Sequence, residues 1–183
     1  MNIEIKSKVF GEKIIFKDFS LNIQDGKVTL IMGESGRGKT TLLRMIAGLD
    51  MDYVGHIDDT GAVLLFQEDR LIENMSLMSN MMLVTDDREK ACEILSELGL
   101  GGEEKSIVSS LSGGMKRRAT IARILLLERK VYLLDEPFSG LDEETKRKTA
   151  EVIKKRTEGR TLVLVSHSRE DGILLGASSV VDL

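Results

Sequence analysis

The chain has 183 residues, 42% hydrophobic and 31% charged, a balance that fits a folded globular protein and excludes an intrinsically disordered one. Lys and Arg total 26 against 30 Asp and Glu, a formal net charge of −4, which argues against a protein that depends on bulk electrostatic attraction to nucleic acid. No apolar run approaches the roughly 20 residues that span a bilayer, the N-terminus lacks a signal-peptide pattern, and the single cysteine, Cys92, cannot form an internal disulfide. We therefore expect an intracellular protein.

The first third of the chain predicts mostly strands. Residues 2–10 and 14–23 alternate apolar and polar side chains around a turn that contains glycine, which predicts an antiparallel hairpin. Residues 27–32 form an apolar run that ends in glycines, typical of a buried strand, and residues 62–66 form another. Between them, residues 39–46 have the apolar spacing of a helix.

The rest of the chain alternates helical and apolar segments. Helices are predicted over residues 88–98, 115–128 and 143–157, and strands over residues 131–134, 161–165 and 180–183. Apolar strands that alternate with helices indicate a largely parallel sheet covered on both faces. The stretch of about 69–112 contains helix without a clear strand, and we interpret it as a helical insertion.

A phosphate-binding loop is predicted between the strand of residues 27–32 and the helix of residues 39–46. The sequence there fits G-x-x-x-x-G-K-[ST] at every fixed position. Glycines let the backbone N–H groups surround a phosphate, Lys39 would reach the β- and γ-phosphates, and the Thr40 hydroxyl would coordinate Mg²⁺. The residues expected to contact the nucleotide are Gly33, Glu34, Ser35, Gly36, Arg37, Gly38, Lys39, Thr40 and Thr41.

Four further motifs follow the phosphate loop in a fixed order. They are Leu-Ser-Gly-Gly-Met at 111–115, Val-Tyr-Leu-Leu-Asp-Glu-Pro at 131–137, Ser-Gly-Leu-Asp at 139–142 and Ser-His at 166–167. The Asn-Lys-x-Asp motif by which GTPases read guanine is absent, which weakens a GTPase interpretation. This order and spacing resembles the nucleotide-binding domains of ATP-binding cassette (ABC) proteins over nearly the whole chain.

The resemblance implies both a fold and a reaction. The fold is the α/β P-loop NTPase type, RecA-like, with a mostly parallel sheet, an antiparallel β subdomain at the N-terminus and an α-helical subdomain inserted after the glutamine loop. The whole chain, residues 1–183, would be one ABC ATPase domain, with a core of about 1–68 and 113–183 and a helical subdomain of about 69–112. Its substrate would be ATP and its metal Mg²⁺.

An Asp-Glu pair carries the expected hydrolytic chemistry. It follows the apolar residues 131–134, so it would lie at the carboxyl edge of the sheet, where α/β proteins bind ligands. By resemblance, Asp135 holds Mg²⁺ through water beside Thr40, and Glu136 orients and deprotonates the attacking water as the catalytic base, with Lys39 on the phosphates. His167 resembles the family's switch histidine, which hydrogen-bonds the γ-phosphate, although a lone histidine is more often structural.

Two more residues resemble nucleotide contacts of the family. Gln67 ends the predicted strand of residues 62–66 and resembles the glutamine that touches Mg²⁺ and links the helical insertion to the core. Phe10 precedes Gly11 and occupies the position of the aromatic that stacks on adenine. The competing interpretation of Phe10 is plain packing beside a turn.

The signature motif predicts a site shared between two copies of the chain. Ser112, Gly113 and Gly114 begin a helix, whose N–H groups and dipole favour an anion. In the family this helix end completes the ATP site of a second subunit, in a head-to-tail dimer, and Asp142 resembles the residue that communicates across that interface. Ser112 also suits an ordinary N-cap, and the two roles are compatible.

The resemblance favours an energy-coupling subunit of a transporter, most similar to nitrate, sulfonate and taurine importer ATPases. Met115 in place of the usual glutamine, and Phe66 to Leu71 around Gln67, carry that similarity. We expect two copies bound to a separate integral-membrane permease, in the cytoplasm on the inner face of the membrane, without nucleic acid. The alternatives are a soluble ABC ATPase of DNA repair or translation, and a regulatory module that binds ATP without hydrolysis.

Three remaining features allow simpler interpretations. An apolar helical stripe of Met75, Met78, Met81 and Met82 could be a groove for a permease helix or the core of the insertion. The basic clusters at 116–118, 146–148 and 154–156 are interpreted as solvated helix faces. The only proline, Pro137, would stiffen the turn that aims Glu136.

Overall fold

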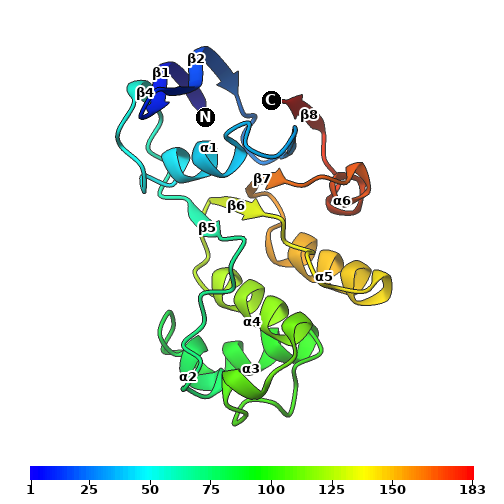
Figure 1. Cartoon of the computed structure of the whole chain (residues 1–183). Coiled ribbons are helices and arrows are strands. Elements are labelled where there is room, and N and C mark those ends of the chain that lie inside the picture. Colours follow the sequence, from blue (N-terminus) through cyan, green and yellow to red (C-terminus); the bar gives the residue numbers. More distant parts are fainter. The chain divides into compact units, whose positions relative to one another are not determined.

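The structure is a computed structural model that describes all residues, 1–183 (Figure 1). The chain forms two compact units, each made of segments that are distant in sequence. Unit 1 consists of Met1–Leu64, Arg129–Asp135 and Gly159–Leu183, and unit 2 consists of Leu65–Glu128 and Glu136–Glu158.

Unit 1 begins with a three-stranded antiparallel sheet. The predicted hairpin is confirmed as β1 (Asn2–Phe10) and β2 (Lys13–Asn22), and the sheet order is β2-β1-β4. The strand β4 (Val54–Ile57) was not predicted, because it has only four residues, mostly exposed, and contains Gly55. That glycine lets the two backbones meet, since a Cβ there would lie 2.1 Å from the carbonyl oxygen of Glu4.

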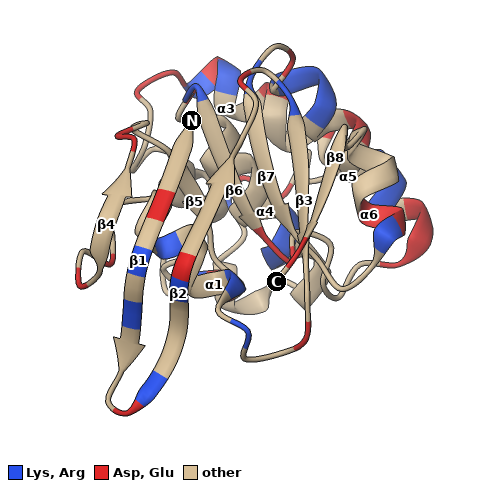
Figure 2. Cartoon of the chain, turned by 90° about the horizontal axis from the view of Figure 1, so that it is seen from above, with Lys and Arg blue, Asp and Glu red and all other residues tan.

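The second sheet of unit 1 has five strands in the order β5-β6-β7-β3-β8. These strands are β3 (Val28–Met32), β5 (Val63–Leu65), β6 (Val131–Asp135), β7 (Thr161–Val165) and β8 (Ser179–Asp182). The pairs β6–β7, β7–β3 and β3–β8 are parallel, and they run side by side in Figure 2. Every residue of β6 and β7 is buried, which confirms the prediction from their uniform apolar runs.

Two helices complete unit 1. The helix α1 (Lys39–Ile46) has the predicted bounds, and it ends where Gly48 adopts a φ of 69°. The helix α6 (Arg169–Leu175) was not predicted. It has seven residues, and its Ile173 side chain is 77% exposed, so its sequence lacks a clear apolar stripe.

Unit 2 is helical. It contains α2 (Leu77–Met81), α3 (Arg88–Glu97), the 3₁₀ turn η1 (Val108–Ser110), α4 (Gly113–Leu125) and α5 (Glu143–Arg156). Its four α-helices each have a side-chain N-cap, and Ser112 sets the start of α4 two residues before the predicted one. The core is formed by residues such as Leu77, Met81, Ile94, Leu95, Ile121 and Ile153, each at most 1% exposed. None of the helices combines the length and the apolar composition that a membrane span requires.

Candidate nucleotide-binding site

The phosphate loop lies in unit 1, between the end of β3 and the start of α1. Gly33, Gly36 and Gly38 have φ values of 143°, 81° and 99°, a backbone region that other residues rarely adopt. Gly38 is the N-cap of α1 and has no side chain to bond the helix amides. The first-turn N–H groups of α1 are therefore left for an anionic ligand.

Lys39 is buried within the loop rather than extended into solvent. Its side chain is 7% exposed, and its ammonium donates hydrogen bonds to the carbonyl oxygens of Gly33 (2.7 Å) and Glu34 (2.9 Å). The loop thus holds a positive charge on its inner side, and its two neutral carbonyl partners are acceptors that an anionic phosphate can outcompete.

Thr40 and Asp135 meet in unit 1 although they are 95 residues apart. The Thr40 hydroxyl donates a hydrogen bond of 2.7 Å to Oδ2 of Asp135, the last residue of β6. Asp135 is 3% exposed and pairs in the sheet with Val165 of β7, which also pairs with Ile31 of β3. The exposed His167 follows Val165 by two residues, so the sheet gathers these groups at one carboxyl edge.

The N-terminal hairpin contacts the phosphate loop. The β1–β2 register shifts next to Val9, so Ile15 has no strand partner and its side chain lies beside Phe16 against Gly38. A Cβ on Gly38 would lie 2.6 Å from Ile15 Cγ2. Nearer the turn, the ammonium of Lys13 donates a hydrogen bond of 3.4 Å to the carbonyl oxygen of Gly36 in the phosphate loop.

Phe10 lies opposite Lys13 in this hairpin, and its side chain is 52% exposed. The ammonium of Lys8 lies 4.5 Å from the centre of the Phe10 ring and bonds Asp50 at 2.8 Å. The ring is therefore only partly packed, by Lys8, and about half of its surface remains accessible.

In unit 2, Glu136 begins the segment that follows β6. Its backbone φ is 48°, a left-handed conformation that is unfavourable for a non-glycine residue. Pro137 follows, as the sequence suggested for a stiff turn, and the Ser139 amide closes the turn by donating to the Glu136 carbonyl at 3.2 Å. The left-handed conformation itself was not predicted.

Gln67 is an exposed residue of unit 2 that follows β5. Its carbonyl oxygen, like that of Phe66, accepts a hydrogen bond from Arg117 of α4. The expectation that residues 116–118 form a solvated face is wrong for Arg117, whose side chain is 3% exposed. Lys146, 8% exposed, likewise departs from the solvated face expected for residues 146–148.

The signature residues form the exposed start of α4. Ser112 is an N-cap, and its hydroxyl accepts a hydrogen bond of 3.3 Å from the Met115 amide. Gly113 is exposed, and a Cβ on Gly114 would lie 3.5 Å from Leu141, so the start of α4 faces the turn before α5.

Asp142 is the N-cap of α5, a role that sequence reasoning did not assign to it. Its carboxylate accepts hydrogen bonds from the Glu144 and Thr145 amides and from the Thr145 hydroxyl, at 2.7–3.1 Å. The Thr145 amide bond, followed by the Thr145 hydroxyl, lowers the pKa of Asp142 from its ordinary value. The side chain remains exposed, so it can still contact a partner.

The expected residues therefore fall into two groups, one in each unit. Unit 1 contains Phe10, residues 33–41, Asp135 and His167. Unit 2 contains Gln67, residues 112–114, Glu136 and Asp142. Chemically, the first group can bind a polyphosphate, and the second offers a carboxylate, an amide and a helix N-terminus.

Comparison with known proteins points to one family. Residues 16–139 match the ABC transporter family. The chain is 37% identical over 176 residues to the aliphatic sulfonates import ATP-binding protein SsuB 1 of Rhodococcus jostii, covering 91% of this chain and 72% of that protein. It is also 37% identical over 182 residues to SsuB 1 of Pseudomonas savastanoi, covering 96% and 77%.

Among solved structures, the chain is similar to the ATP-binding cassette MJ0796 in a dimeric, post-hydrolysis state bound to ADP and Pi. The TM-score is 0.84 at 27% identity, and the match covers 100% of this chain and 94% of the other. A dimeric structure of MJ0796 described as a bacterial ABC transporter cassette gives a TM-score of 0.83 with the same coverage. The predicted resemblance and fold class are confirmed: the chain belongs to the ABC transporter family and is an ATP-hydrolysing cassette of it.

Proposed function

We propose that two copies of this chain bind two ATP molecules with Mg²⁺ and hydrolyse them to drive solute import through a separate permease. The contact between Thr40 and Asp135 is the observation that carries the proposal. It joins the phosphate loop to the carboxyl end of β6, and Glu136 follows Asp135 directly in the chain. A phosphate site and a carboxylate base are thereby tied to the same point of the sheet.

The residues of unit 1 fit Mg²⁺ and a triphosphate. The Thr40 hydroxyl and Asp135 carboxylate are hard oxygen donors, as Mg²⁺ prefers, and no cluster of three His, Cys, Asp or Glu side chains could hold a metal alone. Thr40 would bind the metal directly and Asp135 would hold it through water, and phosphate oxygens, water and Gln67 would complete the coordination. Mg²⁺ would neutralise charge on the phosphates. The Lys39 ammonium would exchange its hydrogen bonds to the Gly33 and Glu34 carbonyls for hydrogen bonds to the phosphates.

The remaining roles concern the reacting groups. We assign Glu136 as the base that orients the attacking water and accepts its proton. The water oxygen then bonds to the γ-phosphorus while the bond from that phosphorus to the β–γ bridging oxygen breaks and ADP leaves. His167 would donate a hydrogen bond to that phosphate, and Phe10 would stack on adenine. The similar proteins are named as ATP-binding proteins of aliphatic sulfonate import, which supports import as the direction of transport. An aliphatic sulfonate is therefore the first solute to test.

Dimerisation would complete each site. The exposed N-terminus of α4, with Ser112 to Gly114, is proposed to bind the γ-phosphate held by the partner copy, and Asp142 to contact the partner. The dimeric cassettes of the similar structures support this arrangement. We also propose that residues 69–112 act as the helical subdomain and residues 1–68 and 113–183 as the core.

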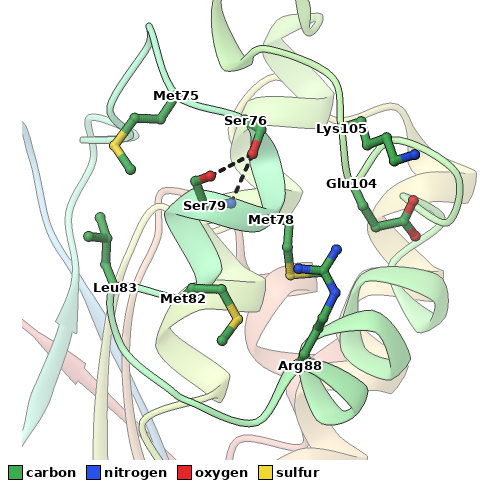
Figure 3. Close-up of a pocket in the computed structure, with 9 residues that line it drawn as sticks. All are labelled: Met75, Ser76, Met78, Ser79, Met82, Leu83, Arg88, Glu104 and Lys105. Atoms are coloured by element: carbon green, nitrogen blue, oxygen red, sulfur yellow. Dashed lines mark hydrogen bonds between the residues drawn. The ribbon is translucent and has the colours of Figure 1, made fainter.

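A pocket of about 370 Å³ in unit 2 supports the permease contact (Figure 3). It is lined by apolar and charged side chains, among them Met75, Met78, Met82, Leu83, Arg88 and Glu104. Of the methionine stripe, Met81 is completely buried in the core of unit 2, whereas Met82 lines the pocket. We propose that a permease helix docks here and holds the protein at the inner face of the membrane.

The proposed reaction is tested with Glu136→Gln, which keeps the size of the side chain and removes the base. We expect kcat for ATP hydrolysis to fall by about 10²–10⁴-fold, the usual contribution of a general base. ATP binding should persist, and gel filtration with ATP should show a trapped dimer. Hydrolysis at the wild-type rate would refute the assignment of Glu136.

The docking pocket is tested separately with Leu83→Glu, which adds a charge on a side chain that is 53% exposed. Co-purification with the permease should fall by about tenfold or more, since a charge is buried in the contact, whereas ATP hydrolysis by the isolated cassette should not change. Undiminished binding to the permease would contradict the docking proposal and leave the ATPase proposal intact.

A further inference from the structure

Arg117 is a buried charge that no motif explains. It lies in the second turn of α4, and its side chain is 3% exposed. A guanidinium this deeply buried is tolerated only when its donors are satisfied, so its partners show what it holds in place. Each of its three nitrogen atoms donates hydrogen bonds, and most of the acceptors are backbone carbonyl oxygens.

The first set of acceptors belongs to the glutamine segment. Nη1 of Arg117 donates to the carbonyl oxygens of Phe66 (2.8 Å) and Gln67 (3.2 Å) and lies 3.4 Å from Oδ1 of Asp69. These residues precede Arg117 by about 50 positions, so the contact is long-range. It fixes the backbone at Gln67 while leaving the Gln67 side chain exposed.

The second set belongs to the segment of the proposed base. Nη2 donates to the carbonyl oxygen of Glu136 at 2.7 Å, and Nε donates to that of Pro137 at 3.0 Å. The Glu136 backbone has a φ of 48°, a conformation that persists only when surrounding contacts enforce it. A planar guanidinium can bond both carbonyls at once, which an ammonium cannot do in the same geometry.

We propose that Arg117 is a positioning residue for ATP hydrolysis, which holds the backbones of Glu136 and Gln67 in fixed places relative to the signature helix α4. The inference rests on the proposed role of Glu136 as the base. Arg117 makes the aim of that carboxylate depend on α4, the helix whose N-terminus carries Ser112 to Gly114. Any displacement of α4 would be transmitted through the guanidinium to both segments.

The test compares Arg117→Lys with Arg118→Lys in the full-length chain. Arg118 is a matched control, because it lies in the same helix and its guanidinium also bonds backbone carbonyls, those of Leu98, Gly99 and, one turn earlier in α4, Gly114, but neither Glu136 nor Gln67. For Arg117→Lys we expect kcat to fall by about 10- to 100-fold, since a shift of about 1 Å at a catalytic group has such effects, with KM for ATP changed by less than about twofold. Arg118→Lys should change neither constant by more than about twofold.

Rates are expressed per molecule that binds labelled ATP, so that misfolded protein does not contribute. Arg117→Gln is measured in parallel, because it removes the guanidinium without leaving a buried charge, and we expect it to lower kcat in the same way as Arg117→Lys. In the Glu136→Gln background, Arg117→Lys should slow single-turnover hydrolysis by much less than the about 10- to 100-fold expected in the wild-type background, because the part of its effect that acts through Glu136 is already lost. Equal kcat losses at Arg117 and Arg118, or a KM rise that matches the loss of kcat, would overturn the inference. Normal hydrolysis by Glu136→Gln would instead overturn the proposed function.

Discussion

The phosphate loop of unit 1 and the catalytic segment of unit 2 are held in different ways. The loop is fixed mainly by residues close in sequence: glycines with positive φ values, and Lys39 bonded to carbonyls five and six positions earlier. Glu136 is held by an arginine 19 positions away that also bonds the segment at Gln67. On the proposed roles, nucleotide binding therefore depends mainly on a local motif, whereas hydrolysis depends on long-range packing.

The largest expected effect separates these two functions. Lys39→Ala removes the positive charge of the loop, so we expect ATP affinity to weaken and kcat/KM to fall by about 10²–10³-fold. The Glu136→Gln variant should show the opposite profile, with binding retained and turnover lost. Equilibrium binding of labelled ATP to both variants measures the difference. Wild-type affinity in Lys39→Ala would show that the loop does not bind the triphosphate through this side chain.

The same contrast explains what sequence could predict. The phosphate loop, β6 and α1 were predicted nearly to the residue, because local spacing determines them. The contacts of Arg117 could not be predicted, since they join three segments that only tertiary folding brings together. One signal was available: Arg117, Thr120, Ile121 and Ile124 recur at helical spacing, and all are buried, so the period placed Arg117 on the inner face.

A smaller effect tests whether the conformation of the phosphate loop depends only on residues close in sequence, because the β1–β2 hairpin also contacts the loop. Gly38→Ala would place a Cβ 2.6 Å from Ile15 Cγ2 at a φ of 99°. We expect a loss of roughly 2–3 kcal/mol in the free energy of unfolding, from backbone strain and overpacking together.

Gly48→Ala is the matched control, because Gly48 also has a positive φ, 69°, but a Cβ at this position would have no atom within 4 Å. Strain alone should cost about 1 kcal/mol there. Urea unfolding of both variants, and of Gly38→Ala combined with Ile15→Ala, separates strain from the hairpin contact. If Ile15→Ala recovers none of the stability lost in Gly38→Ala, the Ile15 side chain does not constrain the loop.

The smallest effect concerns an ion pair that joins α3 to α5 in unit 2. Glu97 accepts hydrogen bonds from Nε of Arg156 at 2.8 Å and from the Lys155 ammonium at 2.7 Å. The Arg156 bond is the main cause that lowers the pKa of Glu97 from its ordinary value of 4.5. Because the folded state favours the ionised Glu97 carboxylate, the contribution of this carboxylate to the free energy of unfolding is complete above pH 4.5. The contribution is lost as pH falls through the lowered pKa of the folded state.

We therefore expect Glu97→Gln to lower the free energy of unfolding by about 1 kcal/mol at neutral pH, and the difference from wild type to vanish in acid. Chemical denaturation at neutral pH and at a series of pH values that descends well below 4.5 measures it. Glu144→Gln is the control, because the Glu144–Lys148 pair is exposed on both sides and should contribute nothing measurable. A Glu97→Gln deficit that stays constant with pH would mean that side-chain packing, not charge, joins these two helices of unit 2.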